Sequence, residues 1–135
     1  MDLIVKTRII KQSVTFRAKP HVVYEALMDS DKHAKFTGGE AHISREIGGK
    51  FSAFDGYSEG VNIELVPDKK IVQSWRASDW PESHYSKATF IMDEDEDGTR
   101  LMFIQSGVPE DQYEDISQGW HDYYWKPMKE MLEQE

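Results

Sequence analysis

The residues best suited to chemistry by type and spacing are an acidic run, Asp93, Asp95 and Asp97, followed by Gly98. This is the D-x-D-x-D-G opening of a calcium loop, in which carboxylates at alternate positions supply oxygen ligands. The twelfth position of such a loop needs a bidentate glutamate, but here it is Ile104. The flanking segments also have strand-like rather than helical patterns. The run therefore predicts a solvated hairpin tip and no metal site.

Histidines could serve as metal ligands or as acid/base groups. They show no ligand spacing, such as two on one helix face, and no acidic partner at the intervals of a metal site; they are His21, His33, His42, His84 and His121. Glu82 with His84 is a candidate acid/base pair, because both types work near neutral pH in a suitable cavity. The simpler interpretation is a polar junction between a loop and a strand.

Two further catalytic patterns fail on inspection. Gly48-Gly49-Lys50 suggests a phosphate-binding loop, yet that pattern requires glycine at Ser44 and serine or threonine at Phe51. The glycines instead indicate a tight turn or a bulge. A hydrolase triad has no G-x-S-x-G elbow to support it. We therefore expect no catalytic residues, no metal and no cofactor.

A long amphipathic helix is predicted from Pro109 to Glu135, where aromatic and apolar residues recur at steps of three and four. Two residues disfavour a regular helix. Gly119 has low helix propensity, and its position beside Trp120 would let another element pass close to the helix. Pro127 has no amide hydrogen for the carbonyl of Tyr123, which predicts a bend near that residue.

The upstream chain predicts an antiparallel sheet that this helix covers, in an α+β fold. A first strand is expected at Thr7–Arg17, followed by short helices at Pro20–Met28 and from Asp29 or Ser30 through Phe36. Short strands joined by turn residues follow; they are Ala41–Arg45, Lys50–Phe54, Gly60–Val66, Ile71–Arg76, His84–Met92 and Thr99–Ser106.

Length and composition limit the functional classes. A chain of 135 residues predicts one domain, residues 1–135. The formal net charge of -9 and the scattered basic residues argue against nucleic acid as a partner. No segment approaches the length of an apolar membrane span, and there is no cysteine. We expect a soluble, cytoplasmic protein.

A set of short motifs carries a family resemblance in its order and spacing; they are Gly48-Gly49-Lys50-Phe51, Phe54-Asp55-Gly56, Leu65-Val66-Pro67, Lys70-Ile71-Val72, Trp75-Arg76, Trp80-Pro81-Glu82, Gly107-Val108-Pro109, Gly119-Trp120, Tyr123-Tyr124 and Met128-Lys129. From about Thr15 to Lys129 the chain resembles the carboxy-terminal domain of the activators of heat-shock protein 90 ATPase. That family belongs to the START-like (SRPBCC, helix-grip) superfamily. The resemblance implies a strongly curved antiparallel sheet wrapped around a long C-terminal helix, with two short helices after the first strand.

The resemblance implies several functions. The first is a non-catalytic START-like domain that binds an apolar small molecule in a cavity between sheet and helix. The alternative is a chaperone-associated protein, a cochaperone or stress-response protein, that lacks the activators' amino-terminal domain and stimulates the ATPase weakly or not at all. A cyclase- or hydrolase-like enzyme ranks behind both. The resemblance implies no cofactor, and either a monomer or a homodimer fits it.

Strand alternation and the aromatic helix face together predict which side chains line that cavity. Phe36 and Phe51 are expected to close its ends, and Tyr123 or Tyr124 to offer a hydroxyl to a polar group of the guest. The expected ligand-binding residues are Phe36, Phe51, Ile63, Leu65, Phe90, Leu101, Phe103, Trp120, Tyr123, Tyr124 and Met128.

Overall fold

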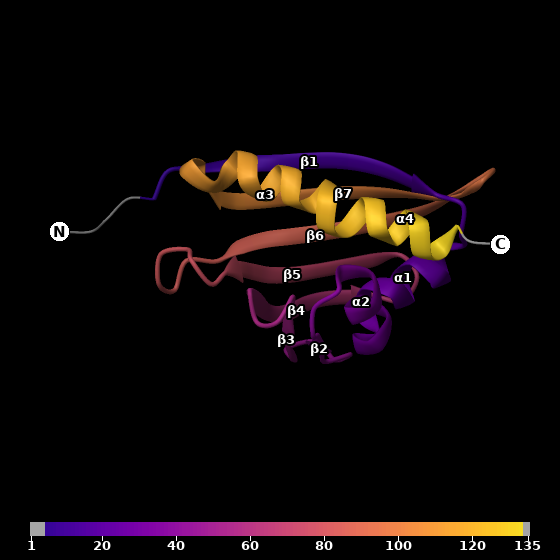
Figure 1. Cartoon of the computed structure of the whole chain (residues 1–135), viewed down its shortest axis with the longest axis horizontal. Coiled ribbons are helices and arrows are strands. Elements are labelled where there is room, and N and C mark those ends of the chain that lie inside the picture. Colours follow the sequence, from indigo (N-terminus) through magenta and orange to yellow (C-terminus); the bar gives the residue numbers. More distant parts are fainter. Residues whose placement is uncertain (1–4, 134–135) are drawn as a thin grey trace.

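The sheet and its long C-terminal helix dominate the computed structural model, which describes residues 5–133. Seven antiparallel strands form one sheet in the order β1-β7-β6-β5-β4-β3-β2. The C-terminal helix lies along one face of this sheet. The two short helices lie beside the last turns of that helix (Figure 1). The helix-grip architecture predicted from the sequence is confirmed.

The strands follow the predicted segments closely, with differences at their ends; they are β1 (Thr7–Phe16), β2 (His42–Ile43), β3 (Lys50–Ala53), β4 (Ser58–Val66), β5 (Lys70–Ala77), β6 (Ser86–Asp95) and β7 (Gly98–Pro109). β2 is shorter than expected because the chain turns after it. The side chain of Asn62 donates to the carbonyls of Ser44 and Glu46 in this turn, at 2.7 and 3.0 Å. Gly48 completes the turn with a φ of 82°.

The two short helices are α1 (Pro20–Met28) and α2 (Ser30–Thr37). Proline stands in the first turn of α1, where its missing amide hydrogen costs nothing. Asp29 caps α2 by accepting from the Lys32 amide, and Gly38 ends α2 in the left-handed conformation. The sequence therefore places both helices correctly.

The C-terminal helix is continuous from Glu110 to Leu132 but changes its hydrogen-bond pattern along the way. A 3-10 turn (Glu110–Gln112) leads into α3 (Tyr113–Trp120), a π-helical turn (His121–Trp125) and α4 (Lys126–Leu132). The prediction that the helix begins at Pro109 is wrong, because β7 extends to that residue. Residues 134 and 135 of the predicted helix lie outside the described part of the chain.

The π-helical turn lies where the sequence predicts a bend. The amide of Lys126 donates to the carbonyl of His121, five residues back. The next residue, Pro127, has no amide hydrogen to continue the usual ladder at Tyr123. The irregularity therefore has a local cause in the sequence, and it sets the directions in which Tyr123 and Tyr124 point.

Side-chain contacts fix the helix to the sheet. Trp125 donates its indole hydrogen to Gln12 of β1 at 2.7 Å, and Gln12 donates in turn to the Ser117 carbonyl at 2.9 Å. On the inner face, Phe103 of β7 contacts Trp120 with ring centroids 4.4 Å apart. No helix among residues 5–133 is long and apolar enough to cross a membrane.

The acidic run forms the tip of the β6–β7 hairpin. Asp95 pairs with Gly98, and the amide of Asp97 donates to the Asp95 carboxylate at 3.0 Å. Residues 93–97 are all exposed. Within the described residues no group of three or more histidine, aspartate or glutamate side chains is arranged to hold a metal ion.

Candidate functional site

An open apolar groove of about 580 Å³ lies between the C-terminal helix and the turn that joins β3 to β4. Its volume falls within the range of small-molecule sites. The turn supplies one wall, the helix supplies the other, and buried tryptophans form the floor; the lining residues are Phe54, Tyr57, Ser58, Trp75, Asp115, Ile116, Gln118, Gly119, Trp120, Asp122, Tyr123 and Tyr124.

The turn wall depends on an unusual backbone. Phe54 and Asp55 both have positive φ values, 57° and 59°, which cost a residue other than glycine roughly 1–2 kcal/mol. The segment after α2 holds this turn in place. Glu40 donates its amide to the Asp55 carboxylate at 2.7 Å, and the Asp55 amide donates to the Glu40 carbonyl at 3.0 Å. The strained backbone thus aims the Phe54 ring at the helix.

The Phe54 ring meets the Tyr123 ring edge-on, with centroids 5.1 Å apart. Tyr123 projects from the π-helical turn and is 53% exposed, whereas its neighbour Tyr124 points inward. Gly119 lies one turn earlier. A Cβ atom at Gly119 would meet only the Tyr123 ring, at 3.7 Å, so the prediction that another element passes close to this glycine is wrong. The glycine borders the groove.

The groove floor is a hydrogen-bonded aromatic cluster. Trp120 contacts Trp75 and Tyr124, with ring centroids 5.7 and 4.4 Å away. The Trp120 indole hydrogen bonds to the fully buried Gln105 at 2.8 Å. Gln105 donates to Ser86 at 2.9 Å, and Ser86 donates to the Trp75 carbonyl at 2.7 Å. These bonds fix the Trp120 ring and connect it to the backbone of Trp75.

Tyr124 connects the groove floor to α2. Nδ1 of His33 lies 3.0 Å from the Leu27 carbonyl, which can only accept, so Nδ1 carries a hydrogen. Nε2 of His33 then accepts from the Tyr124 hydroxyl at 2.9 Å. Burial lowers the pKa of His33 and raises the pKa of Tyr124. The expectation that Tyr124 offers a hydroxyl to a guest therefore conflicts with a hydroxyl already engaged by His33.

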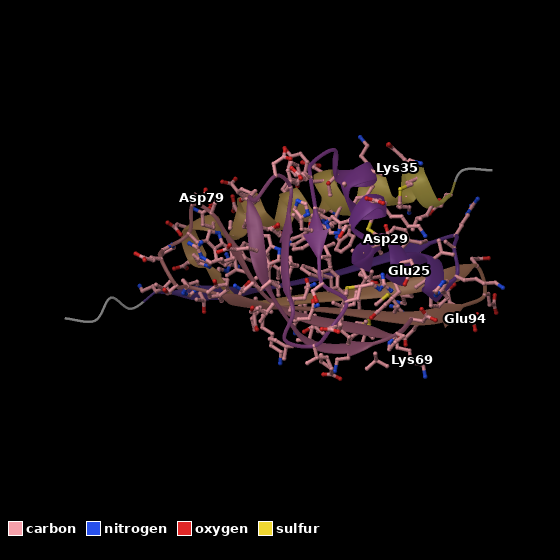
Figure 2. The ribbon with its side chains drawn as sticks, turned by 90° about the horizontal axis from the view of Figure 1, so that it is seen from below. Glu25, Asp29, Lys35, Lys69, Asp79 and Glu94 are labelled. Carbon is pink, nitrogen blue, oxygen red and sulfur yellow. The ribbon has the colours of Figure 1, made fainter. Side chains whose placement is uncertain are left out.

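The mouth of the groove is acidic. Asp115 and Asp122 line it from the helix, and Gln118 donates to the Asp122 carboxylate at 3.0 Å. Burial, together with Asp79, Asp115 and the neighbouring Tyr123, raises the pKa of Tyr57. Asp79 lies at the end of the molecule opposite Glu25, Lys69 and Glu94 (Figure 2).

Most of the expected ligand-binding residues belong to the core rather than to an open cavity. Eight of them are buried in one hydrophobic cluster: Phe36, Phe51, Phe90, Leu101, Phe103, Trp120, Tyr124 and Met128. An enclosed pocket between the sheet and the helix measures only about 20 Å³. Among the expected residues, Trp120, Tyr123 and Tyr124 reach the groove.

The predicted inward direction of Ile63 is wrong, since this side chain is 48% exposed. Asn62 occupies the inward position of β4, where it accepts from Gln73 at 3.0 Å and is buried. A bulge between Asn62 and Glu64 then shifts the register of the strand. Leu65 is partly buried against the core and lies away from the groove.

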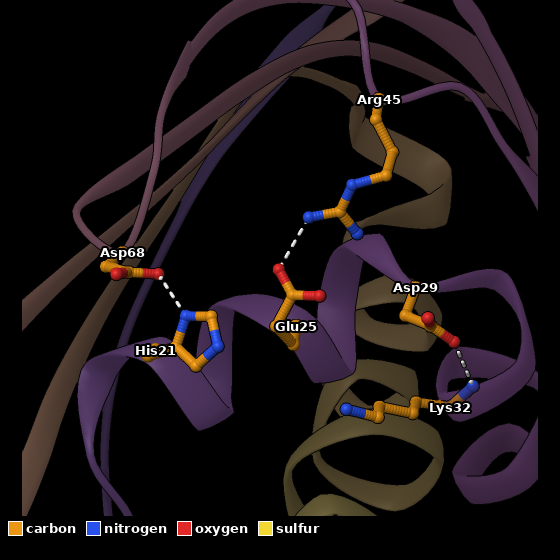
Figure 3. Close-up of polar contacts among 6 residues, drawn as sticks. All are labelled: His21, Glu25, Asp29, Lys32, Arg45 and Asp68. Atoms are coloured by element: carbon orange, nitrogen blue, oxygen red, sulfur yellow. Dashed lines mark hydrogen bonds and ion pairs between the residues drawn. The ribbon is translucent and has the colours of Figure 1, made fainter.

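A second hollow, which Leu65 helps to line, lies between α1 and the turns of the sheet. Ion pairs cross it. Nδ1 of His21 lies 2.9 Å from the Asp68 carboxylate, and Arg45 pairs with Glu25 (Figure 3). The polar groups of the hollow are thus paired with one another, so their role is structural.

Of Glu82 and His84, the candidate acid/base pair, His84 also has a structural role. His84 donates through Nε2 to the Gly107 carbonyl at 2.8 Å and lies against Trp80. Glu82 is exposed on the preceding turn. This arrangement fits the polar junction that the sequence suggests, and both residues lie outside the groove lining.

The groove contains residues that sequence reasoning did not select: Phe54, Tyr57, Trp75, Asp115, Gly119 and Asp122. The sequence does contain a signal for the turn wall. Phe54-Asp55-Gly56-Tyr57 places two aromatic rings on either side of an Asp-Gly turn, which brings them close together.

Comparisons with known proteins agree with this architecture. Residues 17–133 match the family model described as Activator of Hsp90 ATPase homolog 1-like protein. The Activator of 90 kDa heat shock protein ATPase homolog 1 of Homo sapiens is 33% identical over 116 residues, covering 86% of this chain and 34% of that protein. The Dictyostelium discoideum homolog is 33% identical over 115 residues, covering 84% and 30%. The chain thus spans about a third of the length of these curated relatives.

A solved structure matches over nearly its whole length. It is described as an HSP90 activator from Plasmodium falciparum, and it superposes with a TM-score of 0.82 at 26% sequence identity. The match covers 94% of this chain and 96% of that chain. The correspondence therefore includes the sheet, both short helices and the C-terminal helix.

Proposed function

This chain belongs to the Activator of Hsp90 ATPase homolog 1-like family, and we propose that it binds a heat-shock protein 90-class chaperone and modulates the chaperone's ATPase. The observation that carries the proposal is the match, over nearly the whole of both chains, to a protein described as an HSP90 activator. In this proposal residues 1–135 act as one START-like domain in the cytoplasm. The absence of cysteine suits a reducing compartment.

The proposed role is non-catalytic. The polar side chains that line the groove are Ser58, Gln118, Asp115 and Asp122, together with the tyrosines. Asp122 accepts from Gln118, and Tyr124 is bonded to the buried His33. These groups form no pair of an oriented nucleophile and base, which is what acyl or glycosyl transfer requires.

A steady-state ATPase assay of the chaperone, with increasing amounts of the purified protein, tests this role. We expect a weak stimulation that saturates, because the match covers about a third of the curated activators. A heat-denatured sample of the same protein serves as the negative control. An ATPase rate that stays unchanged at saturating protein would overturn the proposed modulation.

The groove supports a second function, the binding of an apolar small molecule. Its volume of about 580 Å³ and its aromatic walls are suited to such a guest, whereas the enclosed space of about 20 Å³ is too small for one. The proposed site is therefore the open groove and not the interior between sheet and helix. Of the lining tyrosines, Tyr57 and Tyr123 are exposed, and Tyr123 is the more exposed of the two, which suits a contact with the guest.

A thermal-shift screen with fatty acids, sterols and flavonoid-like compounds tests the groove, since a ligand that binds only the folded state raises the melting temperature. Gly119→Leu should abolish the shift, because the space at Gly119 opens into the groove. The matched control is Glu114→Leu, an exposed position on the same helix that does not line the groove. Two results would contradict this second function: no compound raises the melting temperature of the wild type, or both variants show the same shift.

A further inference from the structure

The charge and shape of the groove together define a class of ligand. Its charged lining residues are Asp115 and Asp122, both on the helix wall and both exposed. The remaining surface is supplied mainly by aromatic rings. A neutral apolar guest would use those rings but would gain no attraction from the carboxylates at the mouth.

The aromatic rings at the mouth suit a cation. Phe54 and Tyr123 meet edge-on with centroids 5.1 Å apart, and Tyr57 lies beside Phe54 with a centroid separation of 6.5 Å. Ring faces attract an ammonium group, most strongly where water is partly excluded. Carboxylates next to such rings add a direct electrostatic attraction.

The behaviour of Tyr57 supports a negative potential at this place. Burial raises the pKa of Tyr57, and the carboxylates of Asp79 and Asp115 raise it further by disfavouring a second negative charge nearby. The Asp79 and Asp115 carboxylates therefore act on the same small region from the β5–β6 connection and from the helix. A cationic group placed there would be stabilised by the same charges.

We propose that the groove binds a small molecule with an apolar body and a positively charged ammonium head, the body against Trp75 and Trp120 and the head between Tyr123 and Asp115. This inference rests on the proposed small-molecule function of the groove and adds the charge of the ligand. The floor accommodates the body without rearrangement, because the Trp120 indole is hydrogen-bonded to Gln105 and the Trp75 ring is buried against it.

The test uses three matched probes: phenylbutyl trimethylammonium, its neutral isostere with carbon in place of nitrogen, and a phenylalkyl carboxylate of the same length. Binding is measured by calorimetry and by tryptophan fluorescence, because Trp75 and Trp120 form the floor. We expect the cation to bind about tenfold more tightly than the neutral probe. The carboxylate should bind most weakly, and added salt should reduce the preference for the cation.

Two double variants identify the responsible charges. Asp115→Asn with Asp122→Asn should bring the affinities for the cation and the neutral probe together. Asp111→Asn with Glu114→Gln removes the same net charge from exposed positions outside the groove lining and should keep the preference. Equal effects in the two double variants would overturn the inference, since the preference would then come from the overall net charge.

Different results would contradict binding in the groove and the preference for a cation. Equal affinity of the wild type for the cation and the neutral probe would overturn the charge preference and leave groove binding intact. Binding of none of the probes, together with no shift in the thermal screen, would overturn groove binding itself.

Discussion

The hydroxyl of Tyr124 donates to Nε2 of His33 across 2.9 Å, which joins the π-helical turn of the C-terminal helix to α2. Both side chains are buried, and their rings also meet edge-on with centroids 5.2 Å apart. The bond satisfies two polar groups that would otherwise be costly in the core. Because the hydroxyl hydrogen is used in this bond, Tyr124 does not donate it to a guest in the groove.

Tyr124→Phe should therefore lower the free energy of unfolding by about 1–3 kcal/mol, because it leaves Nε2 of His33 buried without a donor. Urea unfolding measures the change. Tyr123→Phe is the matched control, since Tyr123 is exposed, and it should change stability by less than about 0.5 kcal/mol. Equal stability of the two variants would show that the bond contributes nothing.

Stability should fall as the pH decreases through about 6.5, the ordinary pKa of histidine. Burial lowers the pKa of His33 in the folded state, so the unfolded chain takes up a proton at a pH where the folded protein does not. His33→Gln should be less stable at neutral pH but should lose less stability on acidification. Urea unfolding at about pH 7.5 and about pH 5.5 gives the comparison. His121→Gln, at an exposed histidine, is the control and should keep the pH dependence of the wild type. If His33→Gln shows the same pH dependence as the wild type and this control, His33 is not the origin of the effect.

Trp120→Ala should destabilise the protein by about 3–5 kcal/mol, since it removes a large buried side chain. Trp120 is only 3% exposed and contacts the sheet through Phe103. Chemical denaturation followed by circular dichroism measures the loss. A loss below about 1 kcal/mol would place this face of the helix in solvent and contradict the packing of helix on sheet.

The acidic hairpin should not bind calcium specifically. Calorimetric titration should show nothing tighter than about millimolar, the range of weak modules. The Asp97 amide already bonds to the Asp95 carboxylate, and Ile104 pairs with Thr89 in the middle of the hairpin. Micromolar affinity would contradict this prediction.

Local signals in the sequence predicted the elements well because their causes are local. Pro20 and Asp29 mark the starts of α1 and α2, and Pro127 explains the π-helical turn. The direction of Ile63 was not predictable in the same way. The bulge at Asn62 depends on hydrogen bonds to a turn 16 to 18 residues away and to a neighbouring strand, and simple alternation cannot show it.

The sequence predicts which aromatic residues form the core, but it does not predict that they pack without a large cavity. Alternation places Phe90, Leu101 and Phe103 on the inner face, yet only packing in three dimensions decides whether large rings leave a cavity. The groove formed elsewhere, where the left-handed backbone at Phe54 turns its ring toward Tyr123. Positive φ at a phenylalanine is an uncommon conformation that composition and periodicity do not reveal.

Direct binding to the chaperone tests the central proposal most directly. The chain has no cysteine, so Glu96→Cys at the exposed hairpin tip allows a single fluorescent label away from the groove. Fluorescence anisotropy of the labelled protein, titrated with a heat-shock protein 90-class chaperone, should give a saturable rise with a Kd of about 10 μM or tighter, which unlabelled wild type reverses. No change in anisotropy at about 100 μM chaperone would contradict the proposal that this protein is a partner of the chaperone.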